Sequence, residues 1–333
     1  MKRILVLATG GTIASTAQKK GLAPGINIDQ LADYFKQYSP SRTVTIAFLS
    51  LMNKDSTNMQ PEDWLEIAKT IRRSSACYDS FIITHGTDTM AFTAAALSYL
   101  LHDLSRTVVL TGSQIPASFH KTDARRNIQD ALTFATQSVL PGVFVVFDGI
   151  AIAGTRAVKM RTKSYDAFKS VNYPVIASIE NGNVCQMADY KKEQSDHLPV
   201  SMALCPDVLL LRLFPGLSPI IFDFLLEHAK GVIIESFGNG GVPFEGRDLT
   251  AGVRKLHQAG IPVVVTTQCL EEGQNLELYE VGKRAAEAGG MTAGDMNTEA
   301  IVAKLMWILA QTHIITEVKQ LLQTPIALDL NYI

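Results

Sequence analysis

Two short motifs hold residues that could carry out nucleophilic chemistry. Thr9-Gly10-Gly11-Thr12 ends one apolar run, and Thr84-His85-Gly86-Thr87-Asp88 ends another. A threonine hydroxyl attacks a carbonyl carbon only with help from a base or a lysine relay. Thr12, Thr87 and Asp88 are therefore candidates for such chemistry. The structural alternatives are a threonine that turns or caps the chain and an aspartate that caps the next helix.

Two further polar residues have a plain structural interpretation. His85 stands between an apolar run and a glycine, and we interpret it as a buried, hydrogen-bonded group rather than a base. Lys159 taken alone is typical of a solvated surface lysine. Neither the histidine nor the lysine, taken alone, predicts a particular reaction.

The candidate residues follow strands of a predicted sheet. Three apolar runs end in a threonine and a glycine, at Thr9, Thr84 and Thr111. Strand-like and helix-like segments alternate, which favours a parallel sheet with helices on its faces. Because the carboxyl ends of parallel strands share one edge, we expect the hydroxyls and glycine backbones of three loops to converge there.

The same alternation predicts the fold class and the domains. We expect an α/β protein with a larger N-terminal parallel-sheet domain (1–187), a polar linker (188–206) and a smaller flavodoxin-like C-terminal domain (207–333). The predicted helices are 29–38, 61–74, 90–101, 122–138, 219–228, 249–259, 277–288, 297–311 and one that ends at 323. A hairpin-like stretch is expected within 149–185.

Composition narrows the class of protein. The 333 residues are 47% hydrophobic and 19% charged, with a net charge of −2, which favours packed cores and argues against nucleic-acid binding. No apolar run is long enough to span a bilayer, and no signal peptide is evident, so we expect a cytoplasmic protein without membrane contact. The four cysteines are expected to be reduced and mostly buried: Cys77, Cys185, Cys205 and Cys269.

Several catalytic signatures do not occur in the chain. There is no G-x-G-x-x-G after a strand, no Walker motif, no G-x-S-x-G and no H-E-x-x-H, and the histidines do not pair at ligand spacing. Dinucleotide, phosphoryl-transfer, serine-hydrolase and zinc chemistry thus lack their signatures.

The motifs together resemble those of the bacterial-type L-asparaginases, specifically the cytosolic type I group. The likeness covers essentially the whole length. The residues that carry it are Thr9–Ala14, Asp55–Trp64, His85–Thr89, Thr111–Pro116, Lys159–Thr162 and Thr266–Cys269.

The resemblance implies hydrolysis of L-asparagine to L-aspartate and ammonia, without a metal or an organic cofactor. Thr12 matches the family nucleophile, which forms a β-acyl-enzyme ester. Thr87 and Lys159 match the second hydroxyl and its lysine relay, and Asp88 matches the carboxylate that holds the substrate α-ammonium. The residues themselves leave open which threonine reacts first.

The resemblance also implies a set of substrate contacts. Asp55 and Ser56 match the loop for the α-amino and α-carboxylate groups, with Thr57 as a further donor. Backbone amides near Gly11 and Thr87 are expected to stabilise the oxyanion. The predicted substrate-binding residues are Gly11, Asp55, Ser56, Thr57, Thr87, Asp88 and Ser113.

The chain departs from the family pattern at two positions. Leu22 stands near the place of a tyrosine on a mobile loop, and leucine has no hydroxyl to bond with Thr12. We expect Leu22 to act as a lid that excludes water, which leaves proton transfer to Thr87 and Lys159. Ser80 replaces a usual glycine, and we expect only a change in packing.

The resemblance further implies self-association, as a dimer or a dimer of dimers, because the family's smaller domain completes a neighbour's site. Glu271, Glu272 and Gln274 lie in the region expected to approach the neighbour. Two enzymatic alternatives are glutamine hydrolysis and an amidotransferase subunit; the latter normally has an extra N-terminal segment, and this chain begins at the first strand. A non-catalytic amino-acid sensor is the alternative from another class, although binding alone requires neither two threonines nor Lys159.

Overall fold

The chain divides into two compact units. The structure, a computed structural model, describes residues 1–11, 13, 15–18, 21–24, 28–38, 44–190 and 198–331. The first unit is Met1–Met202 and the second is Ala203–Ile333. Each unit has its own sheet and its own buried core.

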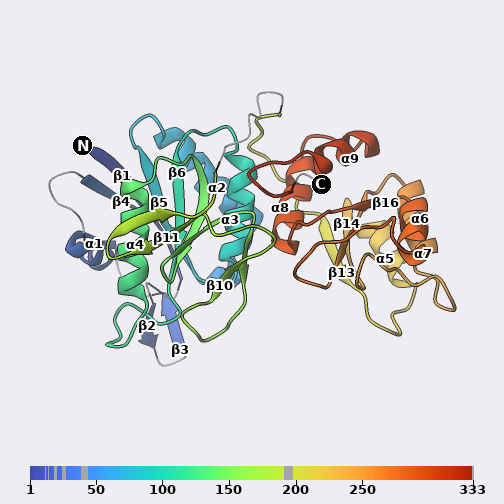
Figure 1. Cartoon of the computed structure of the whole chain (residues 1–333), viewed down its shortest axis with the longest axis horizontal. Helices are drawn as coiled ribbons and strands as arrows, with labels where there is room; N and C mark the ends of the chain where they lie inside the picture. The colour runs from blue at the N-terminus through green and yellow to red at the C-terminus, as the bar shows by residue number, and fades with distance from the viewer. Residues whose placement is uncertain are drawn as a thin grey trace. The chain divides into compact units, whose positions relative to one another are not determined.

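The N-terminal unit is built on an eight-stranded sheet within the described residues, in the order β12-β11-β8-β7-β6-β5-β1-β4. Its strands are β1 (Lys2–Gly10), β4 (Val44–Lys54), β5 (Ser80–Thr84), β6 (Thr107–Thr111), β7 (Gly142–Phe147), β8 (Ile150–Ala153), β11 (Ala177–Glu180) and β12 (Asn183–Gln186). Strands β4, β1, β5, β6 and β7 are parallel, and Figure 1 shows β1, β5 and β6 close together in the middle of this unit. Strands β5 and β6 are buried along their whole length, as expected for strands covered on both faces.

The sheet is mixed rather than wholly parallel. Each of the neighbouring pairs β7–β8, β8–β11 and β11–β12 is antiparallel. Strands β8 and β11 and most of β12 come from the stretch predicted to be hairpin-like. Two-residue turns at 148–149 and 181–182 connect β7 to β8 and β11 to β12. Such short connections allow only antiparallel neighbours. The parallel part, whose strand ends carry the candidate residues other than Lys159, is as predicted.

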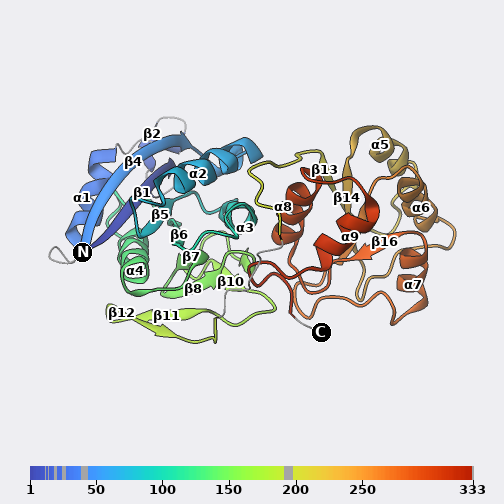
Figure 2. The same cartoon turned by 90° about the horizontal axis from the view of Figure 1, so that it is seen from above.

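Helices cover both faces of this sheet. They are α1 (Ile28–Tyr38), α2 (Pro61–Ser74), α3 (Met90–Leu100) and α4 (Ala124–Gln137). Helix α1 packs against α4 and α2 against α3, and Figure 2 shows the two pairs on opposite sides of the sheet. Helix α2 begins where predicted because Pro61 occupies its first turn and Gln60 and Asp63 form a capping box.

Two small hairpins accompany the main sheet. Strands β2 (Ser15–Gln18) and β3 (Gly21–Pro24) pair with each other, and β9 (Ala157–Lys159) pairs with β10 (Phe168–Ser170). Strand β9, the first strand of the second hairpin, ends at Lys159, which is one of the predicted catalytic residues.

The C-terminal unit contains a parallel sheet in the order β13-β14-β15-β16. Its elements are β13 (Val208–Arg212), α5 (Ile221–His228), β14 (Gly231–Ser236), α6 (Thr250–Gln258), β15 (Val263–Thr267), α7 (Glu280–Glu287), β16 (Gly290–Thr292), α8 (Thr298–Leu309) and α9 (Ile315–Gln323). Helix α6 packs against both α5 and α7, as expected when the crossovers between parallel strands in chain order all have the same hand. Helix α8 packs on β13 and β14 from the face opposite to these helices, as Figure 2 shows.

The prediction for the cysteines is half right. All four are free, but Cys77, Cys185 and Cys269 are exposed and Cys205 is half-buried. The expectation of mostly buried thiols is therefore wrong, because these cysteines lie at turns, on an edge strand or beyond a strand end rather than in the core.

None of the helices in the described ranges combines the length and apolar character that a bilayer-crossing segment needs.

Candidate active site

The loops after β1, β5 and β6 meet through their glycines. A Cβ on Gly11 would lie 2.2 Å from the backbone nitrogen of Gly86, and one on Gly112 would lie 2.3 Å from the carbonyl oxygen of His85. A Cβ on Gly86 would lie 2.5 Å from Ser56 Oγ. Only glycine permits such close backbone approach. The predicted convergence of the loops is confirmed.

Two of the three threonines that end the strands, Thr9 and Thr111, have a structural role instead of the expected chemical one. Thr9 Oγ1 donates to the carbonyl of Thr84 at 2.8 Å, and Thr111 Oγ1 donates to the carbonyl of Val146 at 2.9 Å. Thr84 Oγ1 is buried and has no partner in the described part of the chain. The expectation that these three hydroxyls serve a shared site is wrong, because those of Thr9 and Thr111 bond to neighbouring strands.

A lysine, a threonine and an aspartate form the centre of the candidate site. Lys159 Nζ donates to Thr87 Oγ1 at 2.8 Å and to Asp88 Oδ1 at 2.6 Å. The side chain of Lys159 is 16% exposed and that of Asp88 is 56% exposed. Lys159 is thus largely removed from water, unlike a typical surface lysine. Asp88 pairs with it and does not cap α3, whose N-cap residue is Thr89.

The Asp55–Thr57 segment lies beside the Gly86 loop and forms a short 3-10 turn, Ser56–Asn58. Asp55 Oδ1 accepts hydrogen bonds from the backbone N–H of Thr57 at 2.9 Å and from its hydroxyl at 2.8 Å. Ser56 is buried, and its carbonyl accepts from Thr89 Oγ1 at 2.7 Å. Asp55 and Thr57 are exposed, so they form the accessible side of this turn.

Gln114 is a contact residue that the sequence did not single out. Its side-chain oxygen accepts from Thr87 Oγ1 at 3.0 Å. The neighbouring Ser113, predicted to bind substrate, is fully buried, and its hydroxyl has no partner among the described residues. The only sequence signal for Gln114 was its place in the Thr111–Pro116 motif.

His85 is a structural residue, as interpreted from the sequence. It is fully buried, and burial lowers the pKa of its imidazole to about 4. Its Nδ1 lies 2.7 Å from the carbonyl of Gly86, which only accepts, so Nδ1 carries the proton. Nε2 then accepts from Thr93 Oγ1 at 2.9 Å. Both ring nitrogens are occupied within the fold.

The structure changes the role expected of Gly11. Its backbone N–H donates to the carbonyl of Lys54 at 3.0 Å, so this donor is engaged within the fold and not directed at an oxyanion. The backbone N–H of Thr87, by contrast, has no partner in the described ranges. Thr12 and the side chain of Leu22 lie outside the described residues; the backbone of Leu22 pairs with Ala17 in the β2–β3 hairpin.

Comparison with known proteins places the chain in a family. Residues 3–191 match the family described as "Asparaginase, N-terminal", and residues 207–322 match the one described as "Glutaminase/Asparaginase C-terminal domain". The chain belongs to the asparaginase family.

Relatives of this asparaginase-family chain resemble it over nearly all of its length. An L-asparaginase from Thermococcus kodakarensis is 39% identical over 329 residues, which cover 98% of each chain. A solved structure of the thermostable L-asparaginase from that organism has a TM-score of 0.93 at 38% identity, and one of L-asparaginase I from Vibrio cholerae has 0.89 at 31%, each covering 99% of both chains. A glutamyl-tRNA(Gln) amidotransferase component from Pyrococcus abyssi is 32% identical, over 97% of this chain and 76% of that protein.

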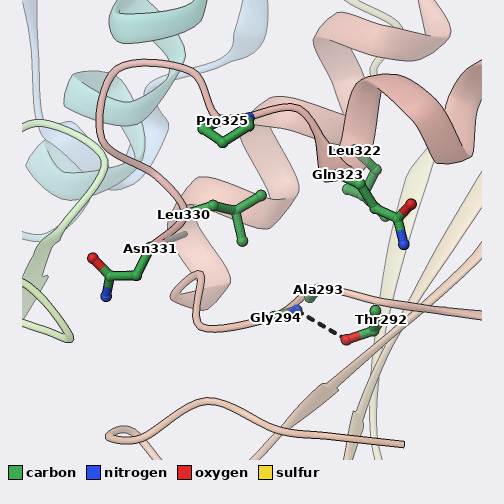
Figure 3. Close-up of a pocket in the computed structure, with 8 residues that line it drawn as sticks. All are labelled: Thr292, Ala293, Gly294, Leu322, Gln323, Pro325, Leu330 and Asn331. Carbon is green, nitrogen blue, oxygen red and sulfur yellow. Dashed lines mark hydrogen bonds between the residues drawn. The ribbon is translucent and has the colours of Figure 1, made fainter. Parts of the chain in front are cut away.

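The C-terminal unit of this asparaginase-family chain holds a separate pocket of about 380 Å³. Figure 3 shows it between the end of β16 and the segment after α9, with Leu322, Pro325 and Leu330 around it. A fully buried ion pair holds that segment, because Lys304 Nζ lies 2.7 Å from Asp329 Oδ2. The pocket includes no residue of the Lys159 cluster.

Proposed function

We propose that the chain is an L-asparaginase that hydrolyses L-asparagine to L-aspartate and ammonia. The observation that carries this proposal is the Lys159–Thr87–Asp88 cluster, at the point where the glycine-tipped loops converge in an asparaginase-family fold. The relatives named L-asparaginase support the same substrate.

In the proposed mechanism Thr12 Oγ attacks the side-chain amide carbon. The carbon–nitrogen bond breaks, ammonia leaves with a proton, and a β-acyl ester forms on Thr12. Water then cleaves the ester, which releases aspartate and restores the hydroxyl. Thr87 positions the attacking group and Lys159 serves in proton transfer, because the largely buried amino group of Lys159 already contacts the hydroxyl of Thr87. The backbone N–H of Thr87 is the donor available to an oxyanion.

A free amino acid requires partners for both of its charges. Asp88 uses Oδ1 for Lys159 and is more than half exposed, so its other oxygen suits a substrate ammonium. We assign the α-carboxylate and α-amino contacts to the turn of Asp55, Ser56 and Thr57. The hydroxyl of Thr57 already donates to Asp55, so Ser56 is the better hydroxyl donor there.

We further propose that the enzyme is of the cytosolic type I group and works as a dimer or a dimer of dimers. Exposed free cysteines suit a reducing cytoplasm. We propose that the second unit, near Glu271 and Gln274, completes the site of a neighbouring subunit. Light scattering of the purified protein tests the assembly, since a monomer that is fully active would contradict it. Cell fractionation tests the location.

Ammonia release from L-asparagine, L-glutamine and their D-forms is the decisive assay. L-asparagine is expected to be the preferred substrate, with L-glutamine as a slower one. Thr12→Ala should abolish turnover without unfolding the chain, whereas Thr12→Ser should keep part of it because the hydroxyl remains. Mass spectrometry of a quenched reaction should place the acyl group on the peptide that contains Thr12. Binding of asparagine without any ammonia release would favour an amino-acid sensor instead.

A further inference from the structure

The orientation of the Gln114 amide follows from its partners. Gln114 Nε2 lies 3.1 Å from the carbonyl oxygen of Arg161 and 3.2 Å from that of Ser164. Carbonyl oxygens only accept hydrogen bonds, so the group that faces both must be the amide NH₂. The amide oxygen of Gln114 is therefore the atom that faces Thr87.

That orientation fixes the direction of the hydrogen bonds through Thr87. The amide oxygen only accepts, so the Thr87 hydroxyl donates its proton to Gln114 over 3.0 Å. Lys159 Nζ in turn donates to Thr87 Oγ1 over 2.8 Å and to Asp88 over 2.6 Å. Lys159 therefore donates a hydrogen bond to Thr87, and Thr87 donates one to Gln114.

The backbone of Gln114 is held in place by a buried carboxylate. Asp123 accepts from the backbone N–H of Gln114 at 2.8 Å and from that of Ile115 at 3.0 Å. Asn127 Nδ2 donates to the same carboxylate at 3.2 Å and to the carbonyl of Gly112 at 2.9 Å. The side chain of Gln114 thus starts from a rigid loop and reaches both Thr87 and the segment that follows Lys159.

We propose that Gln114 is a positioning residue that keeps the proton of Thr87 turned away from Lys159. A threonine attacks only after a base takes its proton. The proton of Thr87 faces an amide oxygen, which is not a base, and its oxygen accepts a hydrogen bond from Lys159 Nζ. Thr87 is accordingly held as an acceptor for an incoming O–H group and is kept from acting as the first nucleophile. The expected effect of Gln114 on kcat rests on the proposed function. The direction of the hydrogen bond from Thr87 to Gln114 does not depend on it.

Two substitutions test the kinetic part. Gln114→Met keeps the length of the side chain and removes both polar groups, and it should lower kcat about 3- to 10-fold, the effect of one neutral hydrogen bond, with KM within about twofold. Gln114→Glu places a carboxylate oxygen against two carbonyls, so it should lose more activity at neutral pH and recover toward acidic pH, where the protonated acid donates again. Gln137→Met is the matched control, because Gln137 likewise bonds two backbone groups, Gly182 O at 2.7 Å and Val184 N at 3.0 Å, and should leave kcat unchanged.

Unchanged kcat in Gln114→Met, or equal losses in it and in Gln137→Met, would overturn the proposal. A neutron structure of the unaltered protein in D₂O tests the hydrogen-bond direction without reference to activity. The deuteron of Thr87 should point at Gln114, and a Thr87 deuteron that points at Lys159 would refute the proposed direction. Lack of ammonia release by the unaltered protein would count against the proposed function alone, and the neutron result would still decide the role of Gln114.

Discussion

Replacing Lys159 by methionine should separate activity from stability. The substitution keeps an unbranched side chain but removes the donor to Thr87 Oγ1, at 2.8 Å, and to Asp88, at 2.6 Å. Loss of a positioned proton-transfer group typically costs about 10²- to 10⁴-fold in rate, or about 3 to 5 kcal/mol of transition-state stabilisation. Because Asp88 is 56% exposed, water largely replaces the lost partner, and the free energy of unfolding should change by less than about 1 kcal/mol.

The measurements are kcat/KM from ammonia release and the free energy of unfolding from urea titration. Lys255→Met is the matched control, since Lys255 Nζ forms an ion pair with Asp223 at 2.5 Å in the C-terminal unit. It should leave kcat/KM unchanged and have a similarly small effect on stability. The assignment of Lys159 is refuted if Lys159→Met keeps more than a tenth of the activity, or if its lost activity is matched by a large loss of stability.

Three further predictions concern the surroundings of the site. Gly86→Ala should destabilise the fold by about 1–3 kcal/mol, because its Cβ would lie 2.5 Å from Ser56 Oγ, and a compensating Ser56→Gly should restore part of that stability in urea titration. The pKa of His85, lowered from 6.5 to about 4, means that only the unfolded chain takes up this proton between those values. Stability should therefore fall by up to about 3 kcal/mol from pH 6.5 to 4, and His85→Gln should remove this contribution from the pH dependence; identical slopes would contradict the assignment. Leu22→Ala should lower turnover if Leu22 excludes water, and full turnover in ammonia release would exclude the lid role.

The order of helices and strands could be predicted from the sequence, because residues at the start and end of each element indicate where it begins and ends. Helix α2 was predicted at 61–74 and found at Pro61–Ser74, since a proline and two acids define its first turn. The convergence of the loops also followed, because parallel strands end at one edge. The antiparallel strands β8, β11 and β12 and the three-residue β16 were not predicted individually, because short strands lack a clear period.

The contacts within the site were not accessible in the same way. Lys159 bonds to a threonine 72 residues away, and Gln114 bonds to groups 27, 47 and 50 residues away. Residue type alone does not distinguish Lys159 or Gln114 from a solvated side chain, and the only local signal is the motif in which each residue stands. Thr9 and Thr111 show the opposite case. Their positions at strand ends predicted a role in the site, but their hydroxyls bond to neighbouring strands of the sheet.

The glycine contacts between the loops have a consequence for protein engineering. A side chain on Gly11, Gly86 or Gly112 would collide with a neighbouring loop, so a larger residue at any one of these positions should destabilise the fold. A library that places larger residues at these glycines should therefore contain many destabilised variants. Attempts to change substrate selectivity should instead vary the exposed side of the neighbouring turn, at Asp55 and Thr57, where new side chains meet solvent rather than another loop.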